Sequence, residues 1–397
     1  MVYLLDNPVR SHPWGSLTVI PKLLGVPLSG QPQAELWLGA HPSLPSLAVT
    51  AEGPVPLDEL VRRDPTGMLG ADVVETFGPR LPYLLKVLAV ERPLSIQAHP
   101  TRTQAAAGFA AENEAGVPLD AANRSYTDPF HKPELGVALS DFVALIGFRI
   151  PTEAEELIGE LAVPGLDEVV DTIRAPDGLA ETVQWILTLS PDRATDLATA
   201  VAAAIRERSA TEPFTTLAGI AELYPTDRGL LIALLLQNMR LPAGEAFAVP
   251  AGTPHCYLHG VVVEAQAASD NTLRAGLTPK RIDVPELLAV LRYVPGIDPR
   301  VPAMTVPGAD VFELAGVPDV RVHRVGLRPE PVMFTGSGSG IVLVTEGSAV
   351  LATDDSKTTL EQGRSAFVPA NCREFTLSGD GIAFVATPAL QPVDTAR

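Results

Sequence analysis

Three separate stretches of the chain carry side chains of the types that bind divalent metal ions. Gln97 and His99 stand two residues apart, so in a β-strand both would point to the same face of the sheet. Glu134 ends a His-Lys-Pro-Glu run, and His255 follows Thr-Pro. Imidazole, carboxylate and amide oxygen ligands together suit Zn²⁺ or another borderline divalent ion and leave room for water or substrate. The residue types therefore indicate a catalytic rather than a purely structural metal site.

A second interpretation of the same residues needs no metal. His99 and His255 can be hydrogen-bonded histidines of the core, and Glu134 can be a solvated carboxylate at the surface. The three stretches are distant from one another in the chain, and residue spacing does not bring them together. The pattern leaves both interpretations open.

The few lysines form a second set of candidates. The chain has five lysines and 24 arginines, so each lysine marks a position where a compact, titratable amine could be needed. Lys86, Lys132 and Lys280 lie in or near the stretches already named, and Lys132 stands beside His131. Chance retention of surface lysines is the alternative, and it weighs most for Lys86.

The segment 264–280 is the third candidate. It is rich in Ser, Asp, Asn, Thr, Gly and Pro, which is typical of a loop, and loops on a rigid β-scaffold often display reacting groups. Arg274 and Lys280 could bind an anionic group, and Arg is suited to bidentate contact. Asp270 could pair with Arg274 or titrate itself. A purely structural loop is the alternative.

The elements that must position these side chains follow two patterns. Residues 1–149 show short apolar runs between Pro and Gly, which predicts β-strands in a sandwich or barrel. Residues 151–240 show apolar spacings of three and four and predict a helical block, with Ser190 as the N-cap of one helix and Pro at its first position. Strand patterns return from residue 241, interrupted by a helix or loop over 284–292. A helical block inserted into a β fold disfavours a doubly wound parallel sheet.

A weak internal repeat relates residues 244–251 to residues 363–370. Gly, Val, Pro and Ala recur at the same spacing, which predicts two copies of one β-unit. In this register His255 lies opposite Glu374, so only the first copy has the histidine. The Gly-Ser run over 336–340 precedes a predicted strand instead of a helix, which favours a loop over a phosphate cradle.

Length and charge exclude several classes of protein. The chain of 397 residues is 46% hydrophobic and long enough for two or three domains. Its 47 acidic and 29 basic residues give a net charge of −18, which disfavours nucleic acid as a partner. No apolar run approaches the roughly 18–20 residues that span a bilayer, no signal peptide is visible, and Cys256 and Cys372 are too few for a disulfide framework. We expect a monomeric protein in the cytoplasm that binds neither nucleic acid nor membrane.

Several motifs are similar to those of one enzyme family, the type I mannose-6-phosphate isomerases, which are zinc-dependent members of the cupin superfamily. The similarity runs in order from about Trp14 to Lys280 and is weaker beyond it, and Gln266 stands where the family often has Met. The motifs that carry the resemblance are Ala34-Glu35-Leu36-Trp37, Leu81 to Leu88, Leu94 to Pro100, His131-Lys132-Pro133-Glu134 and Ser269 to Lys280.

The resemblance implies a mainly β fold with an inserted helical block. It implies a cupin-type β-sandwich, or jelly roll, as the catalytic domain and a second cupin without metal at the C-terminus. We expect the catalytic domain to comprise residues 1–150 and 241–300, the helical domain residues 151–240 and the C-terminal cupin residues 301–397.

The resemblance also implies an activity, the interconversion of mannose 6-phosphate and fructose 6-phosphate. A proton then moves between C2 and C1 through a cis-enediol, with one Zn²⁺ per chain as the Lewis acid. Arg274 matches the family's catalytic arginine and would add positive charge. The zinc ligands implied by the motif match are Gln97, His99, Glu134 and His255.

Further roles are hypotheses about the same reaction. Lys132 is expected to be the base if burial and nearby cations depress its pKa, with binding of phosphate or hydroxyl as the alternative. His131 or Asp270 would assist opening of the sugar ring. The candidate phosphate contacts are Lys86, Ser95 and Lys280.

Two other functions stay open at this point. One is a non-catalytic bicupin that binds a sugar in the same pocket. The other is a metal-dependent isomerase that acts on glucose 6-phosphate or on an unphosphorylated aldose. The lysines favour a phosphorylated substrate, but the choice of epimer depends on the shape of the pocket.

Overall fold

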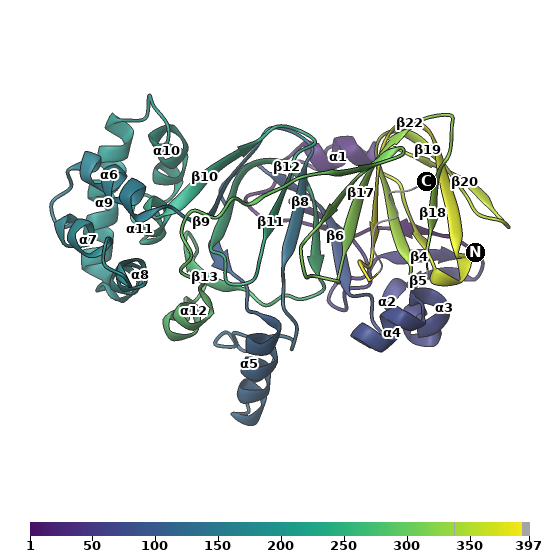
Figure 1. The fold of residues 1–397 in the computed structure, drawn as a ribbon, viewed down its shortest axis with the longest axis horizontal. Coiled ribbons are helices and arrows are strands. Elements are labelled where there is room, and N and C mark those ends of the chain that lie inside the picture. Colours follow the sequence, from purple (N-terminus) through teal and green to yellow (C-terminus); the bar gives the residue numbers. More distant parts are fainter. Residues whose placement is uncertain (337, 391–397) are drawn as a thin grey trace.

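Strands that are far apart in the chain pair into two sheets in this computed structural model, which describes residues 1–336 and 338–390. The helices of the inserted block gather at one end of an elongated molecule, and the C-terminal strands lie at the other end (Figure 1). The predicted mainly β architecture with a helical insertion is thereby confirmed. Within the described ranges, every helix is too short or too polar to cross a lipid bilayer.

The first sheet contains all of the stretches predicted to bind metal. Its long strand β12 pairs antiparallel with β6 and β8 along one part and with β7 and β9 at its N-terminal end. Because one strand joins both sets of partners, four distant segments are held together along its length. The strands of this sheet are β2 (Val9–Arg10), β3 (Glu35–Leu38), β6 (Tyr83–Val90), β7 (Ile96–Ala98), β8 (Glu134–Ala138), β9 (Phe142–Phe148), β10 (Leu236–Leu241), β11 (Ala246–Val249), β12 (His255–Ala267), β13 (Leu273–Gly276) and β14 (Arg300–Val301).

The second sheet joins the C-terminal strands to three N-terminal ones. Strand β1 pairs with β21 on one side and β4 on the other, so residues 1–60 contribute strands to both sheets. The proposed domain boundaries stay a prediction. The strands are β1 (Tyr3–Asp6), β4 (Leu47–Thr50), β5 (Gly53–Pro56), β15 (Met304–Val306), β16 (Ala309–Glu313), β17 (Arg321–Leu327), β18 (Val332–Thr335), β19 (Gly340–Ala352), β20 (Lys357–Glu361), β21 (Ser365–Val368) and β22 (Glu374–Thr387).

The internal repeat appears as two equivalent strand pairs. The short strands β11 and β21 occupy the same positions of the repeat, and the long strands β12 and β22 follow at the same interval, beginning at His255 and Glu374. The two copies of one β-unit are thus confirmed. The residues between β18 and β19 lead into a strand and not a helix, as predicted; Ser337 lies outside the described residues.

The inserted block is helical as predicted up to Leu234, but residues 236–240, which were predicted to belong to it, already form strand β10. Its helices pack through apolar side chains against β7 and β13. Ser190 accepts a hydrogen bond from the Arg193 N–H, and Pro191 is the first residue of α9, which confirms the predicted cap. The segment 284–292, predicted as a helix or a loop, contains a helix over Val284–Val290. The helices are α6 (Pro151–Leu161), α7 (Asp167–Thr172), α8 (Gly178–Thr188), α9 (Pro191–Glu207), α10 (Phe214–Leu223), α11 (Gly229–Leu234) and α12 (Val284–Val290).

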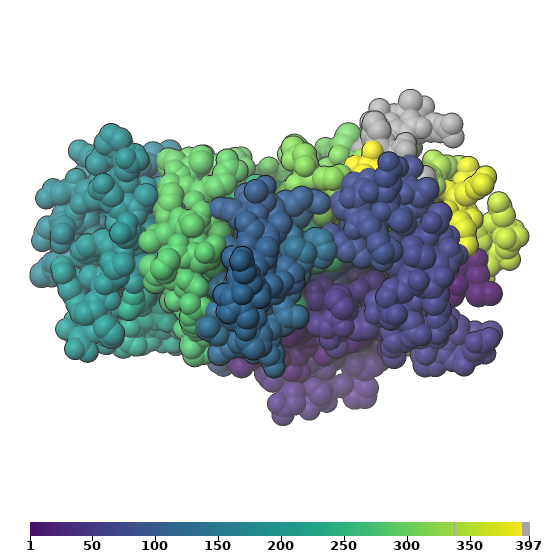
Figure 2. All heavy atoms as spheres, turned by 90° about the horizontal axis from the view of Figure 1, so that it is seen from below, coloured from purple at the N-terminus to yellow at the C-terminus, as the bar shows by residue number. Residues whose placement is uncertain are grey.

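Five helices within residues 1–149 correct the prediction of strands alone. Helix α5 buries only Ala105, so it has no apolar stripe for periodicity to detect. A reciprocal capping box between Thr101 and Gln104 begins it. Seen from below, α5 and the segment after it cover the face between α12 and the α2–α4 helices (Figure 2). These helices are α1 (Val19–Leu24), α2 (Leu57–Arg63), α3 (Pro65–Leu69), α4 (Ala71–Phe77) and α5 (Arg102–Glu114), and a short 3₁₀ turn covers Ala370–Cys372.

We expect Gly229→Ala to destabilise the protein by about 1–3 kcal/mol, because the added methyl overpacks a backbone contact. Gly229 begins α11 and lies against β13, and a Cβ there would come 2.5 Å from the Leu277 nitrogen and 2.8 Å from Gly276 backbone atoms. Asp227 fixes this contact by accepting the N–H groups of Gly229 and Leu277 at 2.7 and 3.0 Å. Urea unfolding measures the change.

Gly219→Ala is the matched control in α10, where an added Cβ meets no atom within 4 Å. It should stabilise the protein slightly, since Ala favours a helix by about 1 kcal/mol over Gly. Equal stability of the two variants would contradict the close packing of the helical block on β13.

Candidate metal centre

Two histidines and one carboxylate converge at the junction of β7, β8 and β12. His99 Nε2 lies 3.2 Å from one carboxylate oxygen of Glu134, and His255 Nε2 lies 3.4 Å from the other. The ligand atoms lie within 4.8 Å of one another, and all three residues are at most 2% exposed. The fold thus brings together three of the four predicted ligands, and it rejects the interpretation of Glu134 as a surface carboxylate.

The free nitrogens of this cluster fit a bound cation. His99 donates its Nδ1–H to the carbonyl of Asn271 at 2.7 Å, and His255 donates to that of Thr253 at 3.0 Å. Each Nε2 then carries no hydrogen and has a free lone pair. Both Nε2 atoms are buried with no hydrogen-bond partner among the described residues. Burial, followed by the charge of Lys132, lowers the pKa of His99 to about 3, so its ring is neutral. Lone pairs that face a carboxylate need a cation between them, and two imidazoles with one carboxylate suit Zn²⁺.

Gln97 lies directly beside this cluster. Its Cα is paired with that of His255 on one side and that of Arg274 on the other. The backbone register therefore puts the fourth predicted ligand next to His255 and the predicted catalytic arginine one strand further, beside Gln97.

Buried polar groups surround Glu134. Lys132 Nζ lies 2.9 Å from its carboxylate, and the Tyr257 hydroxyl lies 2.7 Å from it and 3.0 Å from Glu264. Burial alone would raise the pKa of Glu134, but Lys132 and then the histidines hold it well below its usual range. Burial and the charge of Glu134 raise the pKa of Glu264 to about 8 despite Lys86. Since a hydroxyl donates one hydrogen, a protonated Glu264 satisfies both contacts of Tyr257.

The pKa of Lys132 differs from the sequence expectation. Burial alone would lower it, but the charge of Glu134 and the hydrogen bond to its carboxylate outweigh burial and raise it. The protein's own groups therefore keep Lys132 protonated, whereas its role as base requires a depressed pKa. That role stays a prediction.

A layer of charged side chains packs on the ring of Trp37. Lys86 lies 4.7 Å from the ring centroid and Arg10 lies 4.8 Å from it. Lys86 is buried between Glu35 and Glu264, at 3.4 and 3.8 Å. Burial alone would raise the pKa of Glu35. The charge of Lys86 and the hydrogen bonds with His12 and Trp37 outweigh burial, so the pKa lies well below its usual value.

Arg274 and Lys280 lie close enough to each other for their charges to interact. Arg274 is half-buried in β13, and burial lowers the pKa of its guanidinium. The charge of Arg274, followed by burial and the charge of Arg10, lowers the pKa of the exposed Lys280. The three side chains thus form a positive cluster in an acidic protein.

Comparison with known proteins agrees with this geometry. Residues 2–151 match the phosphomannose isomerase type I catalytic domain, and residues 323–388 match the mannose-6-phosphate isomerase cupin domain. Mannose-6-phosphate isomerases from Salmonella typhimurium and Escherichia coli are each 38% identical over 384 residues, covering 95% of this chain and 97% of theirs. The chain belongs to the type I phosphomannose isomerases.

A solved phosphomannose isomerase shares the whole fold. The Salmonella typhimurium enzyme, bound to its substrate fructose 6-phosphate and a zinc atom, matches with a TM-score of 0.90 and 36% identity over 98% of this chain and all of the other. The predicted family and cupin fold are confirmed. Zinc, the metal in that structure, is also the metal that suits the His99, Glu134 and His255 set of this chain.

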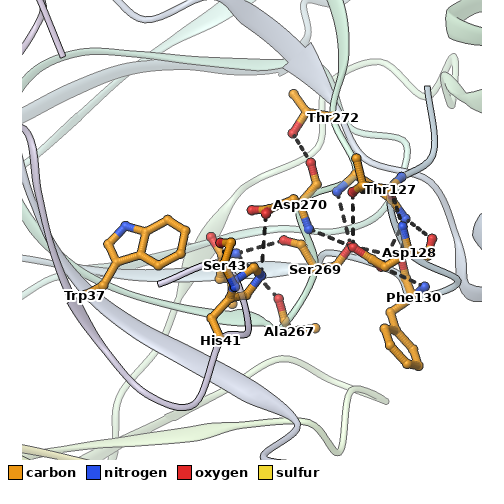
Figure 3. Close-up of polar contacts among 12 residues, drawn as sticks. Trp37, His41, Ser43, Thr127, Asp128, Phe130, Ala267, Ser269, Asp270 and Thr272 are labelled. Carbon is orange, nitrogen blue, oxygen red and sulfur yellow. Dashed lines mark hydrogen bonds and ion pairs between the residues drawn. The ribbon is translucent and has the colours of Figure 1, made fainter. Parts of the chain in front are cut away.

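The other predicted residues lie at different distances from the cluster. Ser95 is half-buried immediately before β7. Asp270 is exposed on the loop between β12 and β13, and its carboxylate lies 3.6 Å from Nε2 of His41 (Figure 3). His131 is engaged elsewhere, because its Nε2 lies 3.1 Å from both carboxylate oxygens of the buried Asp319, which precedes β17.

Sequence reasoning missed Arg10 and His41. His41 is buried, with Nδ1 2.8 Å from the Ser43 hydroxyl and its ring edge-on to Trp37. Burial lowers its pKa, although Asp270 opposes the effect. A single histidine or arginine with no second functional residue at a regular spacing forms no recognisable sequence motif. Only the family motif Ala34-Glu35-Leu36-Trp37 pointed to this region.

Proposed function

We propose that this protein interconverts mannose 6-phosphate and fructose 6-phosphate with one bound Zn²⁺. The observation that carries the proposal is the pair of buried, neutral imidazoles whose free lone pairs face Glu134. The substrate class rests on the Salmonella typhimurium relative, which is named a mannose-6-phosphate isomerase and was solved with fructose 6-phosphate.

The proposed ligands are Gln97, His99, Glu134 and His255. When bound, zinc supplies Lewis-acid stabilisation of negative charge on the sugar oxygens. Arg274, beside Gln97, adds a fixed positive charge that needs no reorganisation during the reaction.

Proton movements are assigned to groups around the cluster. Lys132 is held 2.9 Å from Glu134 and remains the proposed proton-transfer group, with hydroxyl binding as its alternative. Asp270 is favoured over His131 for ring opening, because the His131 Nε2 is already engaged by Asp319. The His41 ring next to Asp270 would orient that carboxylate.

The positive cluster supports a phosphate site. Lys280 and Arg274 lie close enough for the charge of Arg274 to perturb Lys280, and Arg10 adds a third cation. Lys86 and Ser95 remain proposed contacts, although Lys86 is already paired with two carboxylates.

A coupled isomerase assay with a substrate panel tests the proposal. We expect turnover with mannose 6-phosphate, much less with glucose 6-phosphate or free mannose, and zinc in the same preparation. Binding of sugar phosphate without turnover would instead support a non-catalytic bicupin. The monomeric state, the cytoplasmic location and the absence of nucleic-acid binding also remain predictions; sedimentation tests the first.

Lys280→Ala should raise KM for mannose 6-phosphate about 10-fold with little change in kcat, because a charge-assisted contact to phosphate contributes about 1.5 kcal/mol. Lys357→Ala, an exposed lysine in β20 of the second sheet, is the control. Equal KM values for the two variants would remove Lys280 from the phosphate site.

A further inference from the structure

Residues 127–130 are tied to residues 269–271 by a dense set of hydrogen bonds (Figure 3). The Asp128 carboxylate accepts from the Ser269 hydroxyl at 2.8 Å and from the Phe130 N–H at 2.9 Å through one oxygen. Its other oxygen accepts from the Asp270 N–H at 3.0 Å. One side chain thus fixes the loop that carries Asp270.

The Asn271 side chain makes the reciprocal set of bonds. Asn271 is 1% exposed, and its amide nitrogen donates to the carbonyls of Asp128 and Phe130 at 2.7 and 2.9 Å. Its amide oxygen accepts from the Thr127 N–H at 2.8 Å. Every polar atom of this buried side chain is engaged, so the two segments are locked in one register.

The same residue reaches the metal centre through its backbone. The carbonyl of Asn271 accepts the Nδ1–H of His99 at 2.7 Å. A fixed acceptor at Nδ1 sets the tautomer and the orientation of a metal-binding imidazole. The other segment leads directly from Phe130 to Lys132 and Glu134. The hydrogen bonds therefore join His99, the segment that leads to Glu134 and the loop that carries Asp270, which come from three parts of the chain.

We propose that Asp128 and Asn271 are positioning residues that form a clamp, with Asn271 aligning His99 for metal and Asp128 holding Asp270 for turnover. The second half of this inference rests on the proposed function, whereas the first half concerns metal affinity alone.

The two halves of the clamp can be separated by isosteric changes. In Asp128→Asn one oxygen can still accept from the Phe130 N–H, the Ser269 hydroxyl and the Asn271 amide nitrogen, which lies 3.2 Å from it. The new NH₂ replaces the oxygen that faces the Asp270 N–H. We expect kcat to fall about 10-fold or more, because a small misplacement of a reacting group is costly, while zinc affinity stays within about threefold of the wild-type value.

Asn271→Asp has the opposite expected effect. It puts a carboxylate oxygen against the carbonyls of Asp128 and Phe130 in place of the donor, so the segment moves and takes the His99 acceptor with it. Loss of such an outer partner typically costs about 10–100-fold in metal affinity. We expect a decrease of that size in zinc affinity, measured by chelator competition on metal-depleted protein.

Ser140→Ala is the matched control. Ser140 accepts the Val261 N–H at 2.9 Å between two distant segments of the same sheet, at the hairpin between β8 and β9. It should lower stability without changing zinc affinity or kcat. A zinc affinity of Asn271→Asp equal to that of Ser140→Ala would overturn the role of Asn271, and an unchanged kcat of Asp128→Asn would overturn that of Asp128.

Two further measurements keep these outcomes separate. Nitrogen-15 NMR of the His99 ring in the metal-free protein should show the Nε2 lone-pair tautomer in the wild type and a mixed population in Asn271→Asp; the same tautomer in both would also overturn the clamp. If the wild type binds zinc tightly but does not isomerise mannose 6-phosphate, the proposed function fails while the Asn271 result still stands.

Discussion

Replacing His255 by Ala should remove zinc and lower isomerase turnover by about 10³-fold or more, because Lewis-acid stabilisation contributes several kcal/mol to such reactions. The His255 ring is fully buried, and its Nε2 has no partner among the described residues besides the facing carboxylate of Glu134. Its removal leaves a single imidazole, from His99, beside Glu134 and the proposed ligand Gln97, and this set binds the ion too weakly to retain it. Zinc content by mass spectrometry and kcat are measured on the same sample.

His259→Ala controls for damage to the strand, since this residue lies in the same β12 but is exposed. It should retain zinc and activity. Chelation of wild-type protein should abolish turnover in the same way, and added zinc should restore it. Full activity in thoroughly metal-free protein, or stoichiometric zinc in His255→Ala, would contradict the proposed centre.

Arg274→Ala should lower kcat about 10²–10³-fold while zinc is retained, the range found when one preorganised donor to a developing oxyanion is lost. Arg274 lies beside Gln97 in the register of β13 and β7, and its partial burial strengthens its field at the cluster. It is not part of the set formed by His99, Glu134 and His255, so metal binding does not depend on it directly.

Arg274→Lys separates charge from geometry. It keeps a cation but loses the planar fork, so we expect it to recover only part of the lost turnover. Arg281→Ala, an exposed neighbour paired with Asp283, should behave like the wild type. If Arg274→Ala loses zinc in proportion to activity, the arginine supports the structure of the site and not the reaction.

The residue types and local patterns were sufficient for part of this picture. The Ser190 cap was predictable because it joins atoms three residues apart, and the strands of the two repeats followed from matching apolar and turn positions. Helix α5 was missed, because it buries almost nothing and the hydrophobic period that reveals a helix is missing from it.

By itself, the sequence determined which side chains could bind a metal and, through the motif resemblance, which family they belong to. Only the tertiary structure decided that His99, Glu134 and His255 meet, because strands far apart in the chain pair along β12. It also decided that the charge of Glu134 outweighs burial and raises the pKa of Lys132. Likewise, only the tertiary structure brought Asp319 to His131 and His41 to Asp270. Spacing encodes contacts within a turn or a strand, whereas charges and partners in the site depend on burial and on pairing between distant segments.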